Sequence, residues 1–323
     1  MSDSPTTLIP TTVFSGFLGS GKTTIISHLI DELQANHKQV IYIKNEIGNE
    51  TIDSQIMRGK DIQTKELLNG CICCTLVGPF ITAINEIAAS FHPDRIIIEA
   101  SGAADPAAIA LMIDAHPKLR RDGVITLIDV VNFAGYKDIS QTARNQAIFT
   151  DLIVFNKVEL VDLAQKQAVV GYVRELNAHA PIVEAPEGVL RSDIVFGTDP
   201  DELNHLLSEF SHEQTTAEST THVHHAHADH LTKDGIDSLV VSFASAPSRE
   251  QLQTYISNLP SAVFRVKGFV QLNTGTVVVV NKVGIRSEMT PLPADQAIPD
   301  HKKLLVLIGF HLHELVGQLE PKL

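Results

Sequence analysis

A glycine-rich segment near the amino terminus has the residue types and spacing of a phosphate-binding loop. Residues 16–23 read GFLGSGKT, which fits G-x-x-x-x-G-K-[ST], and they lie between a β-branched run and an amphipathic stretch. In such a loop the glycines let backbone N–H groups curl around a polyphosphate, and the helix start adds positive potential. We expect Lys22, as an exposed loop lysine, to reach the β- and γ-phosphates and Thr23 to offer its hydroxyl to Mg²⁺. The alternative is a glycine turn without a ligand.

An acidic residue follows the apolar run at residues 95–98. This residue is Glu99, and Ala100, Ser101 and Gly102 come next. A carboxylate at the carboxyl end of a buried strand needs a partner, and the magnesium shell beside a phosphate loop would provide one. The alternative is a surface glutamate after an edge strand.

The segment Asn156–Glu159 reads NKVE and is close to N-K-x-D, the motif with which GTPases recognise guanine. In that motif the asparagine amide meets the purine edge, the lysine stem covers the ring, and the acid accepts two guanine N–H bonds. Here Glu159 is one methylene longer than aspartate. The choice between GTP and ATP therefore stays open at this point.

All three cysteines of the chain lie in one short run. Cys71, Cys73 and Cys74 occur in NGCICCTL, ahead of an expected helix. Three thiolates can fill three of four tetrahedral positions around Zn²⁺, which leaves one for another protein group, water or a recipient's ligand. The alternatives are inert buried cysteines and a redox pair.

A second group of metal-ligand residue types is the run HVHHAHADH. It contains five of the chain's 15 histidines: His222, His224, His225, His227 and His230. Several neutral imidazoles in a flexible tract can bind a borderline metal ion weakly at each site. The alternative is a polar linker in which histidine only contributes solubility.

Short β-branched runs alternate with longer amphipathic stretches up to about residue 200. This alternation predicts an α/β fold, a P-loop NTPase with a mainly parallel sheet flanked by helices. The expected strands are 12–14, 40–43, 95–98, 124–128, 152–155 and 182–183, and the expected helices are 22–33, 76–89, 138–148, 163–177 and one that opens at Pro106.

The pattern changes at residues 211–235, where Ser, Thr, Glu and His dominate and predict a flexible linker. The consecutive strands that follow predict a small α+β domain. Its expected strands are 236–243, 262–272, 276–283 and 304–309, and its expected helices are 248–257 and 310–319. We therefore divide the chain into a P-loop domain at 1–210, a His-rich linker at 211–235 and a C-terminal domain at 236–323.

Composition excludes several classes of protein. The 38 acidic residues outnumber the 25 Lys and Arg residues, and the net charge of −13 disfavours binding to nucleic acid or to anionic lipid. Apolar runs are far shorter than the roughly 18 residues of a membrane span, and the first residues do not read as a secretory signal. The clustered cysteines suit a reducing compartment. We expect a cytoplasmic protein.

Taken together, the motifs resemble those of the CobW-like P-loop GTPases, relatives of the nickel-insertion GTPases that serve urease and hydrogenase. The matching segments occur in the family's order and approximate spacing. They are GFLGSGKTT, NEIG at 45–48, NGCICC, IIIEASG with Ala104, Asp105 and Pro106, and NKVE. The later segments RVKGFVQL and KKLLVLIG are similar to the C-terminal domain of the same proteins.

The resemblance implies a Mg²⁺-dependent GTPase that binds zinc, or in some members cobalt, at C-x-C-C and delivers it to a client metalloenzyme. By position it assigns the nucleotide phosphates and Mg²⁺ to Gly16, Gly19, Ser20, Gly21, Lys22, Thr23, Thr24 and Glu99, the base to Asn156, Lys157 and Glu159, and the transferred metal to Cys71, Cys73 and Cys74. Glu46 would support Mg²⁺, orient the attacking water or touch the transferred metal.

Three residues depart from the family pattern, and one of them is Glu159, which stands in place of Asp. Lys44 and Asn49 flank NEIG, the segment that corresponds to N-E-F-G in the family. Both positions are often acidic in the family, so a metal ligand expected there is absent. Arg95 and Arg144 are candidates for an arginine finger, but the sequence does not show where either residue lies.

Competing functions are a nucleotide-regulated metal buffer or sensor and a P-loop kinase or other ATP-using transferase. The sequence also allows a homo-oligomer.

Overall fold

The computed structural model describes residues 8–44, 63–66, 77–102, 104–133, 141–197, 235–292 and 303–321. These residues form two compact units that divide between Phe196 and Gly197. The three cysteines, Glu46, the histidine run and the predicted boundary at residue 210 lie outside the described residues. The linker therefore stays a prediction.

The first unit is built on a parallel sheet in the order β3-β2-β4-β1-β5-β6-β7. Its strands are β1 (Ile9–Gly16), β2 (Val40–Lys44), β3 (Gln63–Glu66), β4 (Arg95–Glu99), β5 (Leu119–Asp129), β6 (Leu152–Asn156) and β7 (Ile182–Ala185). The predicted parallel sheet is confirmed. Strand β3, which the sequence analysis missed, is added at one edge.

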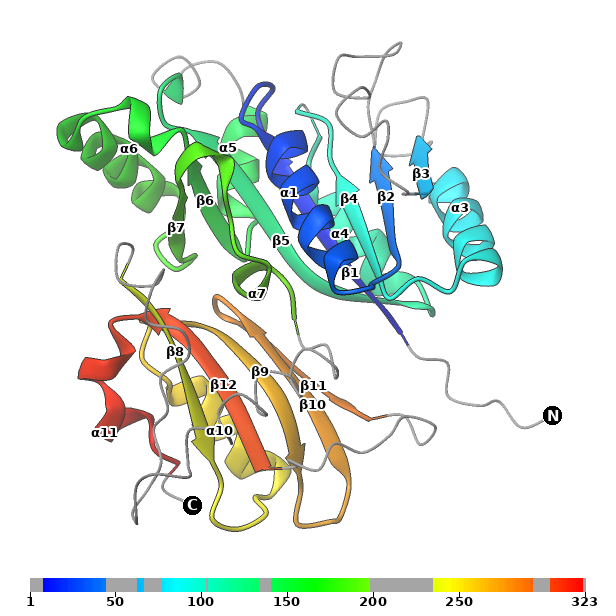
Figure 1. Cartoon of the computed structure of the whole chain (residues 1–323), viewed down its shortest axis with the longest axis vertical. Helices are drawn as coiled ribbons and strands as arrows, with labels where there is room; N and C mark the ends of the chain where they lie inside the picture. Colours follow the sequence, from blue (N-terminus) through cyan, green and yellow to red (C-terminus); the bar gives the residue numbers. More distant parts are fainter. Residues whose placement is uncertain are drawn as a thin grey trace. The chain divides into compact units, whose positions relative to one another are not determined.

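Helices cover both faces of this sheet. They are α1 (Lys22–Ala35), α3 (Val77–Ser90), α4 (Pro106–Ala115), α5 (Gln141–Ile148), α6 (Leu163–Leu176) and the short α7 (Ser192–Val195), with single 3₁₀ turns η2 (Val158–Leu160) and η3 (Pro186–Gly188). Figure 1 shows α1 crossing in front of the central strands. The helix predicted from residue 138 is described only from Gln141.

Alternation along the strands decides which side chains meet α1. One apolar cluster packs α3 and α4 against Val13, Ile43 and Ile98, among other residues. Successive side chains of a strand point to opposite faces. Phe14, Tyr42 and Glu99, which neighbour these residues in sequence, therefore share the face on which α1 contacts β1, β2 and β4.

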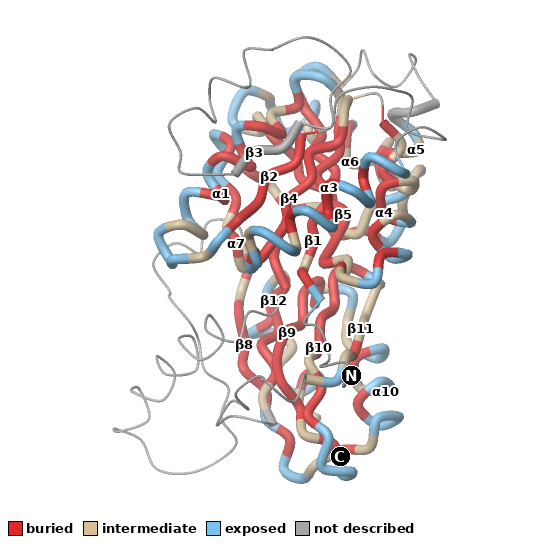
Figure 2. The backbone as a smooth tube through the Cα atoms, turned by 90° about the vertical axis from the view of Figure 1, so that its right-hand side faces the viewer, coloured by how far each residue is buried: buried red, intermediate tan, exposed pale blue. Residues whose placement is uncertain are grey.

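The second unit is an antiparallel sheet in the order β11-β10-β9-β12-β8. Its elements are β8 (Ile236–Ser242), α10 (Arg249–Asn258), β9 (Val263–Gln271), β10 (Val277–Val283), β11 (Arg286–Pro291), β12 (Lys303–Phe310), η5 (Leu312–Glu314) and α11 (Val316–Leu319). The predicted α+β class is confirmed. Figure 2 shows the strands of both sheets as mostly buried and the outer sides of the helices as exposed.

The single closing helix predicted at 310–319 is wrong. Phe310 still pairs with Ile236 as the last residue of β12. His311 then has a φ of 50°, a left-handed conformation that interrupts a right-handed helix. Only the short segments η5 and α11 follow. Among the described residues, none of the helices combines the length and the apolar character required to traverse a bilayer.

Candidate nucleotide-binding site

Five strands of the first unit end in residues that gather at one edge of the sheet. Parallel strands place their carboxyl ends together, and this is where α/β proteins bind ligands. The five terminal residues are Gly16 of β1, Lys44 of β2, Glu99 of β4, Asp129 of β5 and Asn156 of β6. Gly16, Glu99 and Asn156 belong to motifs that the sequence analysis identified. Lys44 and Asp129 were not predicted as site residues.

The glycine-rich loop between β1 and α1 depends on its glycines. Gly16, Gly19 and Gly21 have φ values of 135°, 78° and 94°, which L side chains rarely adopt. A Cβ at Gly16 would lie 2.4 Å from the backbone oxygen of Leu127, and one at Gly21 would lie 2.2 Å from Asn156 Nδ2. The glycine-rich loop therefore packs closely against β5 and β6, and this close contact requires glycine at both positions.

Lys22 is buried within this loop rather than exposed, so the prediction of an exposed lysine is wrong. Only 6% of its surface is accessible. Its stem folds back, and Nζ donates to the backbone oxygens of Gly16, at 2.9 Å, and Phe17, at 3.1 Å. The ammonium thus sits at the centre of the loop's curve, where a phosphate would be held.

Thr23 and Glu99 form the polar centre of the site. The Thr23 hydroxyl lies 3.0 Å and 3.1 Å from the two carboxylate oxygens of Glu99. The Tyr42 hydroxyl donates to the same carboxylate. Glu99 is 5% exposed and lies between β1 and β2 in the sheet. The alternative of a surface glutamate on an edge strand is therefore wrong.

Burial raises the pKa of Glu99 above its ordinary value. The hydrogen bond from Tyr42, the charges of Lys22 and Lys44, and the bond from Thr23 oppose this shift without cancelling it. Lys44 is the register partner of Glu99 in the sheet. A divalent cation would favour the ionised carboxylate. A carboxylate beside a threonine hydroxyl is also the oxygen donor set that Mg²⁺ prefers.

A cavity of about 310 Å³ opens over these residues. That volume falls at the lower end of the usual range for ligand pockets. Its lining brings together Gly19, Gly21, Lys22, Thr23, Thr24, Glu99 and Lys157 from the predicted set, with Leu18, Lys44, Ala100, Ser101 and Gly102. The Ser20 hydroxyl is buried in the loop and has no hydrogen-bond partner among the residues that the structure describes. The site thus fits a polyphosphate with Mg²⁺.

The NKVE segment is attached directly to the glycine-rich loop. Asn156 Nδ2 donates to the Ser20 backbone oxygen at 2.9 Å, and its Oδ1 accepts from the Lys157 N–H at 2.9 Å. Lys157 Nζ donates to the Gly19 backbone oxygen at 3.0 Å. The two motifs therefore form one continuous surface, a relationship that their sequence spacing did not reveal.

Asp129 is a site residue that the sequence analysis missed. Its carboxylate lies 2.6 Å from Lys157 Nζ and accepts bonds from the Asn132 side chain and backbone. Burial by itself would raise the pKa of Asp129, but the bonds from Lys157 and Asn132 outweigh it and lower that pKa. The signal was available, because Asp129 follows an apolar run just as Glu99 does.

Glu159 lies at the same edge, on the turn η2. Its carboxylate accepts the backbone N–H of Glu187 at 3.1 Å. Glu187 belongs to η3, whose Gly188 backbone oxygen lies 3.0 Å from His28 Nδ1. Glu159, the acidic residue of NKVE, is exposed, and its hydrogen bond connects it to the turn after β7.

The structure places the two arginine candidates differently. Arg95 begins β4, at the edge opposite the glycine-rich loop, and it is buried in an ion pair with Asp122. Its guanidinium also lies 4.3 Å from the ring centre of Phe196. The suggestion that Arg95 is an arginine finger is therefore wrong. Arg144 lines a separate cavity of about 40 Å³ with Phe17 and Asp129.

Comparison with known proteins agrees with this geometry. Residues 10–184 match the CobW/HypB/UreG nucleotide-binding domain, and residues 236–318 match the cobalamin synthesis protein CobW C-terminal domain. The chain belongs to the CobW/HypB/UreG family. The resemblance expected from the sequence is confirmed, and the nucleotide-binding match includes the predicted site residues from Gly16 to Glu159.

Several CobW-family relatives align with most of the chain. The zinc chaperone CobW of Sinorhizobium sp is 29% identical over 94% of this chain and 93% of that protein. The zinc-regulated GTPase metalloprotein activator 1 of Schizosaccharomyces pombe is 25% identical over 97% and 85%. The zinc chaperone YjiA of Escherichia coli is 31% identical over 59% of this chain and 61% of its own length.

Two solved structures show a lower similarity to this chain. The Zn(II)-bound YjiA GTPase from E. coli covers 96% of both chains at 21% identity, with a TM-score of 0.45. The hydrogenase maturation factor HypB from Archaeoglobus fulgidus covers 56% of this chain and 82% of its own, at 18% identity and a TM-score of 0.39.

Proposed function

We propose that this chain is a Mg²⁺-dependent GTPase that binds zinc and delivers it to a client metalloenzyme in the cytoplasm. The proposal that the chain binds GTP rests on the two hydrogen bonds from Asn156 and Lys157 to the glycine-rich loop. They join a phosphate site and a base-reading motif into one site. The names of the relatives, zinc chaperone and zinc-regulated GTPase metalloprotein activator, support the zinc part.

In this proposal each residue of the nucleotide site has its own role. Lys22 leaves its loop carbonyls to meet the β- and γ-phosphates, and the N–H groups of residues 19–24 surround the phosphate chain. Thr23 and Glu99 hold the metal shell. When bound, Mg²⁺ neutralises charge on the β- and γ-phosphate oxygens. Lys44, which lines the same cavity, adds positive charge beside the phosphates. Asn156, Lys157 and Glu159 recognise the base.

The metal cargo is assigned to Cys71, Cys73 and Cys74, whose thiolates suit Zn²⁺ and also accept Co²⁺. Glu46 lies between the nucleotide site and these cysteines in sequence. The segment from Lys44 to Cys74 would therefore transmit the nucleotide state to the thiol ligands. The histidines at 222–230 would bind further metal ions weakly. A nucleotide-regulated buffer or sensor without directed transfer is the competing function.

The nucleotide part is tested by Lys22→Ala with Lys166→Ala as the matched control. Lys166 lies on α6 and pairs with Glu184, away from the cavity. We expect Lys22→Ala to abolish GTP turnover, measured as phosphate release, and the control to retain it. Circular dichroism and thermal unfolding verify both folds, which is needed because Lys22 is buried. Wild-type turnover in folded Lys22→Ala would overturn the phosphate assignment.

Base choice is tested by competition. Excess GDP should inhibit GTP turnover strongly and excess ATP only weakly, because Glu159 is proposed to accept the guanine N–H groups. Equal inhibition by the two nucleotides would show that guanine is not recognised and would favour the ATP-using alternative.

The zinc part is tested by linkage between the two sites. Zinc affinity, measured against a chelator of known affinity, should differ between the GDP state and a non-hydrolysable GTP state by roughly 1–3 kcal/mol. Replacing Cys71, Cys73 and Cys74 by Ser should remove both this difference and the tight site while GTP binding persists. Stoichiometric zinc transfer to an acceptor on hydrolysis distinguishes the chaperone from the buffer or sensor.

A further inference from the structure

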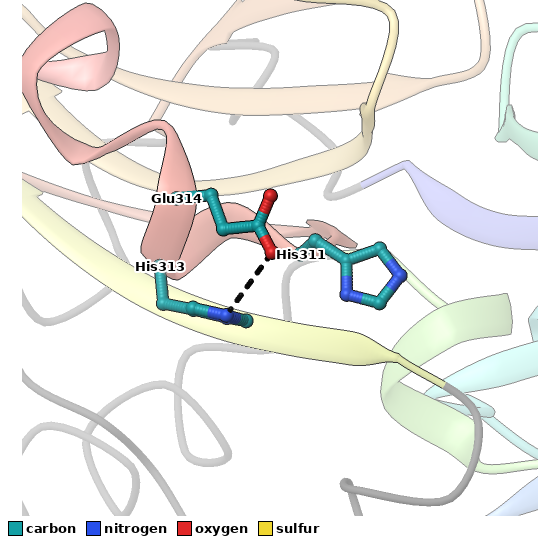
Figure 3. Close-up of side chains that lie close together, drawn as sticks. All are labelled: His311, His313 and Glu314. Carbon is teal, nitrogen blue, oxygen red and sulfur yellow. Dashed lines mark ion pairs between the residues drawn. The ribbon is translucent and has the colours of Figure 1, made fainter.

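The second unit contains a compact group of metal-ligand side chains that no sequence motif identified. His311, His313 and Glu314 follow β12, and one potential ligand atom of each lies within 4.8 Å of the others. All three side chains are exposed. Figure 3 shows the His313 ring and the Glu314 carboxylate directed toward each other, with the His311 ring beside them.

The spacing within this group suits a shared metal ion better than a direct hydrogen bond. His313 Nε2 lies 3.7 Å from Glu314 Oε1, which is long for a hydrogen bond. Zinc binds imidazole nitrogen and carboxylate oxygen at about 2.0–2.2 Å, so two such ligands at a tetrahedral angle are about 3.4 Å apart. Small side-chain rotations would therefore bring both groups into a shared coordination sphere.

A fourth residue orients the imidazole of His313. Asp237, on β8, lies 2.6 Å from His313 Nδ1 through its Oδ2 and also accepts the His313 backbone N–H at 3.3 Å. This contact reserves Nδ1 for the carboxylate and leaves Nε2 on the side of Glu314. Metal-binding histidines commonly have their second nitrogen held by a carboxylate in this way.

The backbone also fixes His311 in place. The His311 N–H donates to the Gly235 backbone oxygen at 2.8 Å. Its ring packs over Gly235, where an added Cβ would lie 2.6 Å from the ring. A larger residue at position 235 would therefore displace the imidazole from the group.

We propose that His311, His313 and Glu314 form a binding site for a borderline divalent cation such as Zn²⁺, Co²⁺ or Ni²⁺. Two imidazoles and one carboxylate favour these ions over Mg²⁺ or Ca²⁺, which prefer oxygen ligands. Three protein ligands leave one tetrahedral position open to water or an exchanging ligand. The site belongs to the second unit and does not depend on the proposed GTPase function.

The test uses a background chain that lacks residues 222–230 and carries Ser at Cys71, Cys73 and Cys74. Zn²⁺ binding is measured by competition with a chromophoric chelator, and Co²⁺ by its d–d absorption. Mildly alkaline buffer is used because the bond to Asp237 raises the pKa of His313, and protons compete with metal. We expect one ion per chain and cobalt spectra without a sulfur-to-metal band.

Single variants then identify the ligands. His311→Asn, His313→Gln and Glu314→Gln should each weaken binding at least tenfold, and Asp237→Asn about 10–100-fold. His92→Asn is the matched control, because His92 is also exposed with a positive φ, 46°, and it should bind as the background does. Absence of Zn²⁺ binding in the background, or binding that none of the ligand variants changes, would overturn the site.

Discussion

The ammonium group of Lys157 lies 2.6 Å from a carboxylate oxygen of Asp129, at the point where β6 and β5 end side by side. The same nitrogen donates to the Gly19 backbone oxygen. Asp129 is 1% exposed and Lys157 is 32% exposed at their side chains. One half-exposed lysine therefore links a buried strand end to the glycine-rich loop.

Asp129→Asn should weaken GDP binding and reduce discrimination against ATP. The substitution removes the charge that fixes the Lys157 stem beside the nucleotide. Because Lys157 is partly exposed, we expect an effect of about 1 kcal/mol, or about fivefold in affinity. Fluorescent-nucleotide titration measures it. Asp151→Asn serves as the control, since Asp151 contacts the Val124 N–H at 2.9 Å near the other end of β6. Equal losses in both variants would contradict the assigned role of Asp129.

Gly19→Ala and Gly21→Ala should differ in stability although both positions have positive φ. A Cβ at Gly19 meets nothing within 4 Å, whereas one at Gly21 would lie 2.2 Å from Asn156 Nδ2. Both variants place alanine at a positive φ and so share the backbone strain. The difference between their free energies of unfolding therefore measures the clash of the added Cβ with Asn156, and we expect Gly21→Ala to be less stable by about 1–3 kcal/mol. The double variant Gly21→Ala/Asn156→Ala should recover part of it. Equal stabilities of the two single variants would mean that the loop yields freely.

Asp122→Ala should destabilise the first unit by about 3–5 kcal/mol, because it leaves the buried charge of Arg95 without its carboxylate. Asp114→Ala is the matched control. Asp114 pairs with Arg121 at 3.1 Å with partly exposed side chains, and such pairs contribute about 1 kcal/mol or less. Urea unfolding of both variants tests the contrast, and a cost for Asp122→Ala as small as the control's would argue against a buried ion pair.

The second unit should become more stable as the pH rises above neutrality. Burial lowers the pKa of Lys282 from 10.5 to about 8. Between these values the unfolded chain binds more protons than the folded chain, so the free energy of unfolding increases with pH. Lys282→Met should abolish this increase and stabilise the unit near neutral pH by up to about 3 kcal/mol. Urea unfolding across this pH range checks both effects, and an unchanged pH dependence in Lys282→Met would refute the assignment.

The sequence predicted the central strands well, because buried parallel strands are continuous apolar runs such as residues 95–98 and 124–128. It missed β3 and β11, which read QTKE and RSEMTP. Both lie at the edge of their sheets, where pairing on one side only does not require an apolar run. Strand β3 begins at Gln63 and pairs with β2, which already ends at Lys44, so its position leaves no local pattern. Strand β11 instead follows β10 in a tight hairpin at Gly284, and this turn was a local signal that the sequence analysis did not use.

The same distinction applies to the nucleotide site. Lys22, Thr23 and Glu99 were predicted because each lies within a local motif, and the structure brings them into one cavity. Tyr42 was missed because its bond to Glu99 arises from the pairing of β2 with β4. The burial of Lys22 was also missed, since it depends on the curve of the loop rather than on residue type.

The central position of β1 has a consequence for synthesis of the chain. Its partners are β4 and β5, which leave the ribosome roughly 80 or more residues later. At about 5–20 residues per second, the first strand emerges roughly 4–17 s before either neighbour exists. During that interval the apolar segment that carries the glycine-rich loop is unpaired, so nascent chains that stall before Glu99 should require a holdase chaperone to stay out of aggregates.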